Sequence, residues 1–278
     1  MGAVPHLEPV RGSVVEFFVV GLSVLIWAGC AQAIAPGDAP ATPEVWVESP
    51  RWQVELAPEV ELQVFNPYGD VRGRSSADGK LLVVGIIQRF ALEQDDAEVL
   101  IEEAEGRVKV HTRYPSAERR LADGRLNGRI DLSVLVPAGL KMRVETDSGF
   151  IEVKGVDREL VARTDSGRIR LTAARAVEAE TKTGDLTAVL KDPTALQPAR
   201  LVTETGALRV DLLDAPTLSL RAQTEGKLLP RFGQLEKAEP SRRSGFSELE
   251  VGKKPWGLEA VSKKGSIEIH ALPPTGLR

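Results

Sequence analysis

The stretch Thr164-Asp-Ser-Gly167-Arg-Ile-Arg-Leu171 decides the fold, because its pattern Thr-x-x-Gly-x-Ile-x-Leu recurs along the chain. The other clear repeats are Thr146-Asp-Ser-Gly149-Phe-Ile-Glu-Val153, Thr181-Lys-Thr-Gly184-Asp-Leu-Thr-Ala188, Thr203-Glu-Thr-Gly206-Ala-Leu-Arg-Val210 and Ser262-Lys-Lys-Gly265-Ser-Ile-Glu-Ile269. The first four glycines lie 18, 17 and 22 residues apart. A repeat near this period predicts one structural unit that is stacked several times.

Apolar and polar residues alternate within each repeat, as Ala162, Thr164, Ile169 and Leu171 show. A period of two is typical of strands with one buried face. Two strands cannot bury a face alone, so we expect the units to stack at about 4.8 Å, the ordinary strand spacing. The sequence therefore predicts an all-β fold, a single-stranded β-solenoid or β-helix-like stack of 17–22-residue coils. Its inward ladder would contain Ile151, Ile169, Leu186 and Leu208.

The glycines of the repeats are expected to be structural corners, where turn residues such as Asp-Ser-Gly allow a positive φ. These corners are Gly149, Gly167, Gly184, Gly206, Gly226 and Gly265. The repeat at Thr224-Glu-Gly226 is irregular, because its glycine follows the threonine by two residues instead of three. We interpret the insertion 230–256 as one coil with an enlarged polar loop. The alternative to a stack is an antiparallel sandwich of similar hairpins.

Upstream of residue 134 the β pattern is less regular. Asn66-Pro-Tyr-Gly69 is typical of a turn that precedes a strand, and Pro137 with Gly139 should end one strand and turn the chain into the next. Only the windows 94–105 and 173–180 are compatible with helices. Alternation in the second window favours a strand.

The repeats at 164–171 and 181–186, with the preceding Val136-Pro-Ala-Gly139, resemble the bacterial putative-adhesin β-strand repeat family. The resemblance covers residues 66–269 and is clearest over 134–210. It implies a domain of unknown function found on secreted or envelope proteins, with a β-helix-like stack and no catalytic residues. The insertion between Gly226 and Gly265 departs from the regular family pattern.

The N-terminal residues 1–33 have the layout of a signal peptide, with Arg11 before the apolar run 17–27 and small residues after it. The run is too short to span a bilayer comfortably, since a spanning helix needs about 20 residues. Cleavage after Ala33 would give a secreted or periplasmic protein. Cleavage before Cys30 would give a lipoprotein anchored through that residue in the outer membrane or cell envelope. An uncleaved membrane anchor is the third possibility.

The predicted organisation of the mature chain is a Pro-rich tether over 34–50 followed by a β-repeat domain over 51–278. The clearest coils lie within 134–228. Cys30 is the only cysteine, so either cleavage excludes a disulfide framework and thiol chemistry. This composition suits an extracytoplasmic location.

Composition excludes several classes of partner and reaction. The net charge of −4 and the pI near 5.6 give no general attraction for nucleic acid. His111 and His270 have no second histidine at ligand spacing, so no metal site is predicted. No motif selects a catalytic residue or a cofactor.

A carboxylate site remains conceivable at the corners. Stacking would place Asp147, Asp165, Lys182 and Glu204 in one column. Neighbouring acids could hold Ca²⁺ or act on a glycan, but Lys182 favours a self-neutralising ladder.

We therefore expect a non-catalytic, exported or lipid-anchored envelope protein with an adhesin-like binding or structural role. Its partner would be an envelope polysaccharide or another protein. One alternative is a β-helix polysaccharide lyase or hydrolase that uses the segment 230–255. Another is an envelope-stress or assembly factor whose exposed coil edge accepts a strand from a second protein.

Overall fold

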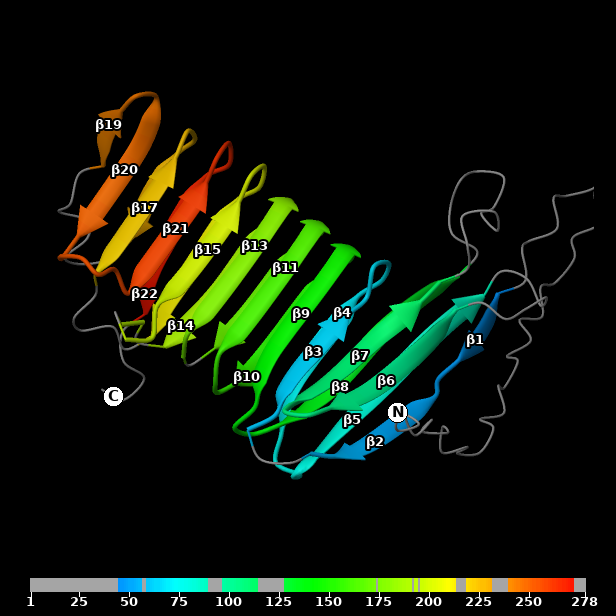
Figure 1. Ribbon diagram of the computed structural model, residues 1–278. Helices are drawn as coiled ribbons and strands as arrows, with labels where there is room; N and C mark the ends of the chain where they lie inside the picture. Colours follow the sequence, from blue (N-terminus) through cyan, green and yellow to red (C-terminus); the bar gives the residue numbers. More distant parts are fainter. Residues whose placement is uncertain are drawn as a thin grey trace, which may run out of the picture.

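The computed structural model describes residues 45–56, 59–89, 97–114, 128–173, 175–191, 193–194, 196–213, 219–231 and 240–272. These residues form two 11-stranded sheets, and no helix occurs among them (Figure 1). The prediction of an all-β fold is thus confirmed. Residues 1–44, which contain the predicted signal peptide and Cys30, lie outside the described part.

Sheet A has the strand order β1-β5-β8-β4-β10-β12-β14-β16-β22-β18, and β2 also pairs with β5. Its strands are β1 (Trp46–Glu48), β2 (Arg51–Glu55), β4 (Val71–Ser76), β5 (Lys80–Arg89), β8 (Arg129–Pro137), β10 (Ile151–Val156), β12 (Ile169–Ala173), β14 (Leu186–Lys191), β16 (Leu208–Leu213), β18 (Leu228–Arg231) and β22 (Ile267–Leu272). The strand β1 lies inside the range 34–50, for which the sequence predicts a tether.

Sheet B has the strand order β19-β20-β17-β21-β15-β13-β11-β9-β3-β7-β6. Its strands are β3 (Glu61–Phe65), β6 (Glu98–Ala104), β7 (Arg107–Arg113), β9 (Lys141–Ser148), β11 (Leu160–Ser166), β13 (Val177–Thr183), β15 (Ala199–Thr203), β17 (Leu220–Thr224), β19 (Ser241–Arg243), β20 (Phe246–Val251) and β21 (Leu258–Ser262). Within the window 94–105 the described residues 98–104 form β6 and not a helix, whereas the strand favoured in the window 173–180 is confirmed by β13.

Consecutive strands from β7 to β18 alternate between the two sheets, so odd-numbered strands lie in sheet B and even-numbered strands in sheet A. We call two such strands and the corner that joins them a coil. Neighbouring coils pair in parallel and in register, as Leu160 beside Val177 shows in sheet B. In sheet A the register places Ile151, Ile169, Leu186 and Leu208 side by side. All four side chains are fully buried.

The core is a set of inward-facing aliphatic columns that runs along both sheets. Strand positions alternate between buried and exposed, for example over β11 and β14. Some columns combine large and small side chains. In sheet B, for example, Leu201 lies between Ala179 and Ala260. Burial of each large aliphatic side chain stabilises the fold by roughly 1.5–3 kcal/mol. The alternation read from the sequence thus accounts for the core.

Backbone crowding at the corners explains the glycine of the repeat. A Cβ atom on Gly167 would lie 1.9 Å from the carbonyl oxygen of Gly149, and one on Gly206 would lie 1.9 Å from that of Gly184. Among the corner glycines of the predicted coils, only Gly184 has a clearly positive φ, at 144°. The expectation that these corners need a positive φ is therefore wrong for most of them. Glycine is needed there because the coils stack so closely that no side chain fits.

The order of the coils in space differs from their order along the chain at both ends of the stack. The coil β3–β4 lies between β7–β8 and β9–β10, and β21–β22 lies between β15–β16 and β17–β18. The interpretation of 230–256 as one further coil must be corrected. Residues 230–231 end β18, and the described residues that follow include β19 and β20, an antiparallel pair that extends sheet B beyond β17.

Antiparallel strands also flank the other end of the stack. In sheet A, β5 pairs antiparallel with β8, and in sheet B, β6 pairs antiparallel with β7. In the described part of the chain these pairs cover the last parallel strands, and such covering limits strand addition by another molecule.

Candidate binding surface

The corner column predicted from the sequence is present: the register places Asp147 beside Asp165, and from Asp165 onward the charges alternate. The Lys182 Nζ atom lies 2.7 Å from Asp165 Oδ1, and Lys263 Nζ lies 2.8 Å from Glu204 Oε1. A hydrogen bond to Asp165 raises the pKa of Lys182, and a hydrogen bond from Lys263 lowers the pKa of Glu204. Opposite charges at these distances neutralise one another at the surface.

The inserted coil β21–β22 contributes to this neutralisation. The Lys263 amide donates to Thr203, and its carbonyl accepts from Glu225, so Lys263 lies between Glu204 and Glu225. Were the coils ordered as in the chain, these two acids would be neighbours. Among the residues the structure describes, no three His, Cys, Asp or Glu side chains gather as metal ligands would. The column is thus better suited to holding neighbouring coils in register than to binding a metal cation.

A second surface, on the outer face of sheet A, carries an excess of positive charge. We call it the cationic face, and it comprises Arg72 and Arg74 on β4, Lys154 on β10, Arg168 directly before β12 and Arg170 on β12. The three strands are adjacent and parallel, and their register places Glu152 between Arg72 and Arg170. Arg72, Arg168 and Arg170 are exposed. The excess occurs on a chain whose net charge is −4.

Glu152 is the carboxylate at the centre of the cationic face. It is buried, and its two oxygens accept from Arg74 Nη2 at 2.6 Å and Lys154 Nζ at 2.7 Å. Hydrogen bonds from Lys154 and Arg74 lower its pKa to about 2. Glu152 therefore stays ionised and holds two of the cations in place, while Arg72 and Arg170 on either side point into solvent.

The arginines of this face can bind an anionic group. Within the described part of the chain, neither Arg168 nor Arg170 lies within 4.0 Å of an acidic oxygen, and Arg72 reaches Asp70 only at 4.0 Å. A guanidinium presents paired N–H donors that match carboxylate, sulfate or phosphate oxygens. Thr172 on β12 lies in register with Lys154, Thr187 on β14 lies in register with Arg170, and both add hydroxyl groups. The arrangement is suited to an extended anion that crosses several strands.

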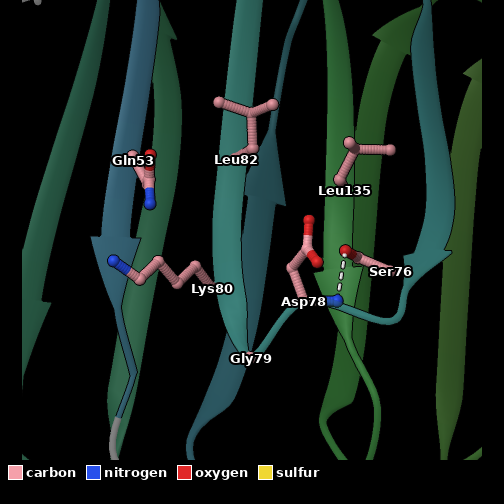
Figure 2. Close-up of a pocket in the computed structure, with 7 residues that line it drawn as sticks. All are labelled: Gln53, Ser76, Asp78, Gly79, Lys80, Leu82 and Leu135. Carbon is pink, nitrogen blue, oxygen red and sulfur yellow. Dashed lines mark hydrogen bonds between the residues drawn. The ribbon is translucent and has the colours of Figure 1, made fainter.

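A shallow pocket of about 360 Å³ lies on sheet A near the hairpin from β4 to β5 (Figure 2). Leu82 and Leu135 form its apolar part, and Asp78 and Lys80 lie at its rim. The Lys80 ammonium lies 2.9 Å from Glu55 Oε1, and the backbone amide of Asp78 donates a hydrogen bond to Ser76 Oγ at 3.1 Å. The Lys80 ammonium is therefore paired with a carboxylate that lies outside the pocket lining.

A buried polar network joins the coils β3–β4 and β7–β8. Asn66 donates from Nδ2 to the carbonyl of Ile130 at 2.9 Å and accepts from Thr112 and Tyr114. Burial raises the pKa of Tyr114, whose hydroxyl also accepts from the Ile130 amide. With so many partners inside the protein, these groups hold the coils together and are not available to a substrate.

Neither described histidine belongs to a catalytic arrangement. His111 lies on β7 with Nε2 3.7 Å from Glu102, and burial lowers its pKa. His270 lies on β22, 3.5 Å from Glu268 and 3.9 Å from Asp211. No serine, threonine or cysteine hydroxyl or thiol donates to either ring in the described residues, so no nucleophile–base pair is formed there.

Two acids and an arginine from the C-terminal part of the chain also meet on the outer face of sheet B. Arg221 Nη2 lies 2.9 Å from Glu248, and its Nε lies 3.6 Å from Glu250. These side chains come from β17 and β20, and neither of the two pockets described in the structure includes them. An ion-paired group on a sheet face is a weak candidate for glycan cleavage, which needs acids that flank a bound sugar.

Solved structures with some similarity to the chain come from bacteria. A crystal structure described as a putative cell adhesion protein from Clostridium sporogenes has 12% identity and a TM-score of 0.43, covering 81% of this chain and 100% of that one. A putative adhesin from Bacteroides fragilis has 12% identity and a TM-score of 0.35, covering 83% and 99%. A putative adhesin from Parabacteroides distasonis has 7% identity and a TM-score of 0.22, covering 80% and 97%.

Identities and TM-scores this low do not assign the chain to a family. No protein-family model matches the chain, and no curated protein matches it in sequence. Within the described ranges there is no helix with the length and apolar character to cross a bilayer.

The sequence prediction missed the cationic face. Its residues occupy outward positions on or next to the strands that follow the corner glycines. The alternation of the sequence identifies these positions only as polar. A comparison of the residue three places after each corner glycine would have found it, because Arg72, Glu152 and Arg170 share that position after Gly69, Gly149 and Gly167.

Proposed function

We propose that the protein is a non-catalytic, extracytoplasmic β-solenoid that binds an anionic envelope polysaccharide through the cationic face of sheet A. The observation that carries the proposal is the excess of exposed arginines around the clamped Glu152. Parallel strands repeat at about 4.8 Å, so Arg72 and Arg170, which lie on either side of Glu152, are about 10 Å apart along the stack. A polymer with repeated acidic groups could contact several of them at once, which raises avidity without a deep pocket.

Binding to purified acidic and neutral polysaccharides of similar length tests this proposal. We expect binding to the acidic polymer only, with an affinity that falls as salt is added, because exposed charge pairs are screened. The variant Arg72→Glu/Arg170→Glu should bind at least about tenfold more weakly, since it replaces two attractive contacts with repulsive ones.

Arg200→Glu is the matched control. Arg200 is exposed on the outer face of sheet B, where it lies 3.8 Å from Glu259. It carries the same charge on the opposite side of the molecule and should leave binding unchanged. Arg200→Glu reverses one charge and the test variant reverses two, so a loss of binding free energy in Arg200→Glu that is half of the loss in the test variant would show that only net charge matters. No binding to any acidic polymer would reject the proposed ligand.

Export and anchoring are part of the proposal and need their own test. Palmitate labelling with membrane fractionation should compare the wild type with Cys30→Ala. Label that disappears in the variant supports a lipoprotein, and an unlabelled product that begins at Ile34 supports free export. A full-length, unlabelled product in the cytoplasm would contradict both.

The proposed absence of catalysis is tested by incubating the purified protein with envelope glycans and measuring new reducing ends. We expect no turnover. Turnover that is lost in Asp147→Asn/Asp165→Asn, or in Glu248→Gln, would replace the binding proposal with the enzyme alternative and would identify the acids responsible.

A further inference from the structure

Residues 258–272 fill a slot between two coils that precede them in the chain. The strand β21 pairs in parallel with β15 on one side and β17 on the other, and β22 pairs in the same way with β16 and β18 (Figure 1). In the described part of the molecule, β17 and β18 reach the rest of the stack only through these two strands. The segment 258–272 therefore joins the β17–β20 unit to the remaining coils.

The slot matches this segment along its whole length. Leu258, Ala260, Ile267 and Ile269 are fully buried. Backbone hydrogen bonds join the segment to both neighbouring coils. The Leu208 amide donates to the Ser266 carbonyl, and the Ile267 amide donates to the Lys227 carbonyl, each at 2.8 Å. A segment that fits here thus needs strand, corner and strand in this register.

The corner of the segment carries the most specific contacts. The Ser262 hydroxyl donates to the Gly206 carbonyl at 3.0 Å, and Lys263 pairs with Glu204 at 2.8 Å. A Cβ atom on Gly265 would lie 1.8 Å from the Gly206 oxygen, so glycine is required there. The slot therefore selects a Ser-Lys-x-Gly corner over an arbitrary strand.

Only residues 252–257 tie the segment to the strand before it. This connection crosses β17, because β20 and β21 pair with opposite edges of that strand. It spans two strand spacings, about 10 Å, and has Gly252 and Gly257 at its ends. All other contacts of 258–272 are non-covalent and would be the same for an identical segment from another molecule.

Chain order leaves the slot open before it is filled. Residues 199–231 are synthesised before 258–272, so both walls of the slot can form while the filling segment is absent. An open slot exposes the unpaired backbone groups of four strands, which is a template for strand addition.

We propose that this slot is an interaction surface for residues 258–272 of a second copy of the chain, and that two copies exchange these strands reciprocally. The exchanged dimer keeps every core and corner contact and changes the course of residues 252–257 alone. Protein concentration and the opening of that connection then decide between monomer and dimer.

A mixed-disulfide experiment tests the exchange in the full chain, with Cys30→Ser to remove the native thiol. Val202 and Val261 are half-buried register partners on β15 and β21, so their backbones are close enough for a disulfide. Chains carrying Val202→Cys alone and Val261→Cys alone are mixed, warmed to the onset of unfolding, cooled and oxidised. We expect a covalent dimer on a non-reducing gel.

The control mixture combines Glu180→Cys and Val202→Cys chains, whose positions are register partners in coils that follow one another in the chain. Exchange of 258–272 cannot bring these two together, so the test mixture should give several-fold more dimer. Equal amounts of dimer in the two mixtures would indicate random surface contact and overturn the proposal.

A double variant, Val202→Cys/Val261→Cys on one chain, shows whether the pair can form a bond. If it closes within the chain while the test mixture gives no more dimer than the control, the segment stays with its own chain and the exchange is refuted. If the double variant does not close, the register of the slot is wrong and the proposal falls with it.

Discussion

Close approach between backbones, more than turn conformation, determines the glycine at the corner of each coil. Gly167 has no left-handed φ, yet a Cβ atom there would lie 1.9 Å from the carbonyl oxygen of Gly149. Atoms cannot approach so closely, so any side chain at this position must push two coils apart. The backbone hydrogen bonds and aliphatic contacts between those coils would weaken together.

We predict that Gly167→Ala destabilises the protein by on the order of 3 kcal/mol, as an overpacked site does when its neighbour is backbone. Gly79→Ala is the matched control, since a Cβ atom there would meet nothing within 4 Å and its φ is not in the left-handed region. Its effect should stay within about 0.5 kcal/mol. Urea unfolding of the two variants measures both values, and equal midpoints would contradict the crowding argument.

Glu152 should make stability depend on pH in the acidic range. Its folded pKa is about 2, below its ordinary value near 4.5, because Lys154 and Arg74 bind the ionised form. A lowered folded pKa means that the stabilisation is complete above about pH 5 and is lost as the pH falls towards 2. The two cationic partners are partly exposed, so we expect on the order of 1–2 kcal/mol and not the full value of the shift.

The variant Glu152→Gln tests this directly. At pH 7 it should be less stable than the wild type by that amount, and the difference should shrink towards zero near pH 2. Unfolding in urea at pH 7, 4 and 2.5 gives the three values. A difference that is constant with pH would show that the carboxylate charge contributes nothing.

At the scale of the element, a column of buried hydroxyls accompanies the corner glycines. Thr181, Thr203 and Ser262 each donate to the glycine carbonyl of the neighbouring coil, at 3.0, 3.1 and 3.0 Å. The Thr at the start of the repeat is therefore a hydrogen-bond donor between strands that are already paired. This role explains why the position stays polar although its side chain is fully buried.

We predict that Thr181→Val costs about 1–2 kcal/mol, because valine keeps the shape of the side chain and removes the donor to the Gly167 carbonyl. Thr187→Val, on the half-exposed outer side of β14, should change stability by less than about 0.5 kcal/mol. Thermal unfolding of both variants distinguishes them. If both melt like the wild type, the buried hydroxyl has no structural role.

The strands themselves were predictable from the sequence because the information for each one is local. Alternation around Ile169 and Leu171 specifies a strand with one buried face, and the same signal recurs in the next repeat. The Asn66 coil was not recognised, because asparagine replaces threonine at the buried position. Its spacing to Gly69 is nevertheless that of the repeat, and Asn66 also hydrogen-bonds across coils.

At the scale of the whole molecule, the order of the coils could not be predicted. The five repeats identified in the sequence share a buried Thr or Ser, a corner Gly and aliphatic columns, so each fits beside any other on these signals alone. The difference lies in outward charge. Insertion of Lys263 between Glu204 and Glu225 separates two acids that chain order would make neighbours. The cationic face of sheet A likewise results from which outward residues become neighbours, a property of the assembled stack.

Stability should vary along the stack, because each coil contacts only its two neighbours. The unit formed by β17, β18 and β20 joins the other described strands only through β21 and β22. We predict that Ile267→Ala, which truncates a fully buried side chain of β22 and costs roughly 2–4 kcal/mol, releases this unit before the rest unfolds. Amide hydrogen exchange should then accelerate over 220–231 and 246–251 and remain slow over 141–166.

Ile169→Ala removes the same atoms from a buried position in the middle of the stack. Since β12 pairs with β10 and β14, exchange should accelerate over 151–156 and 186–191 in that variant. Uniform acceleration in both variants would mean that the stack unfolds as one cooperative unit. The slot between β15–β16 and β17–β18 could then open only by global unfolding, so strand exchange between copies would be confined to conditions that denature the whole protein.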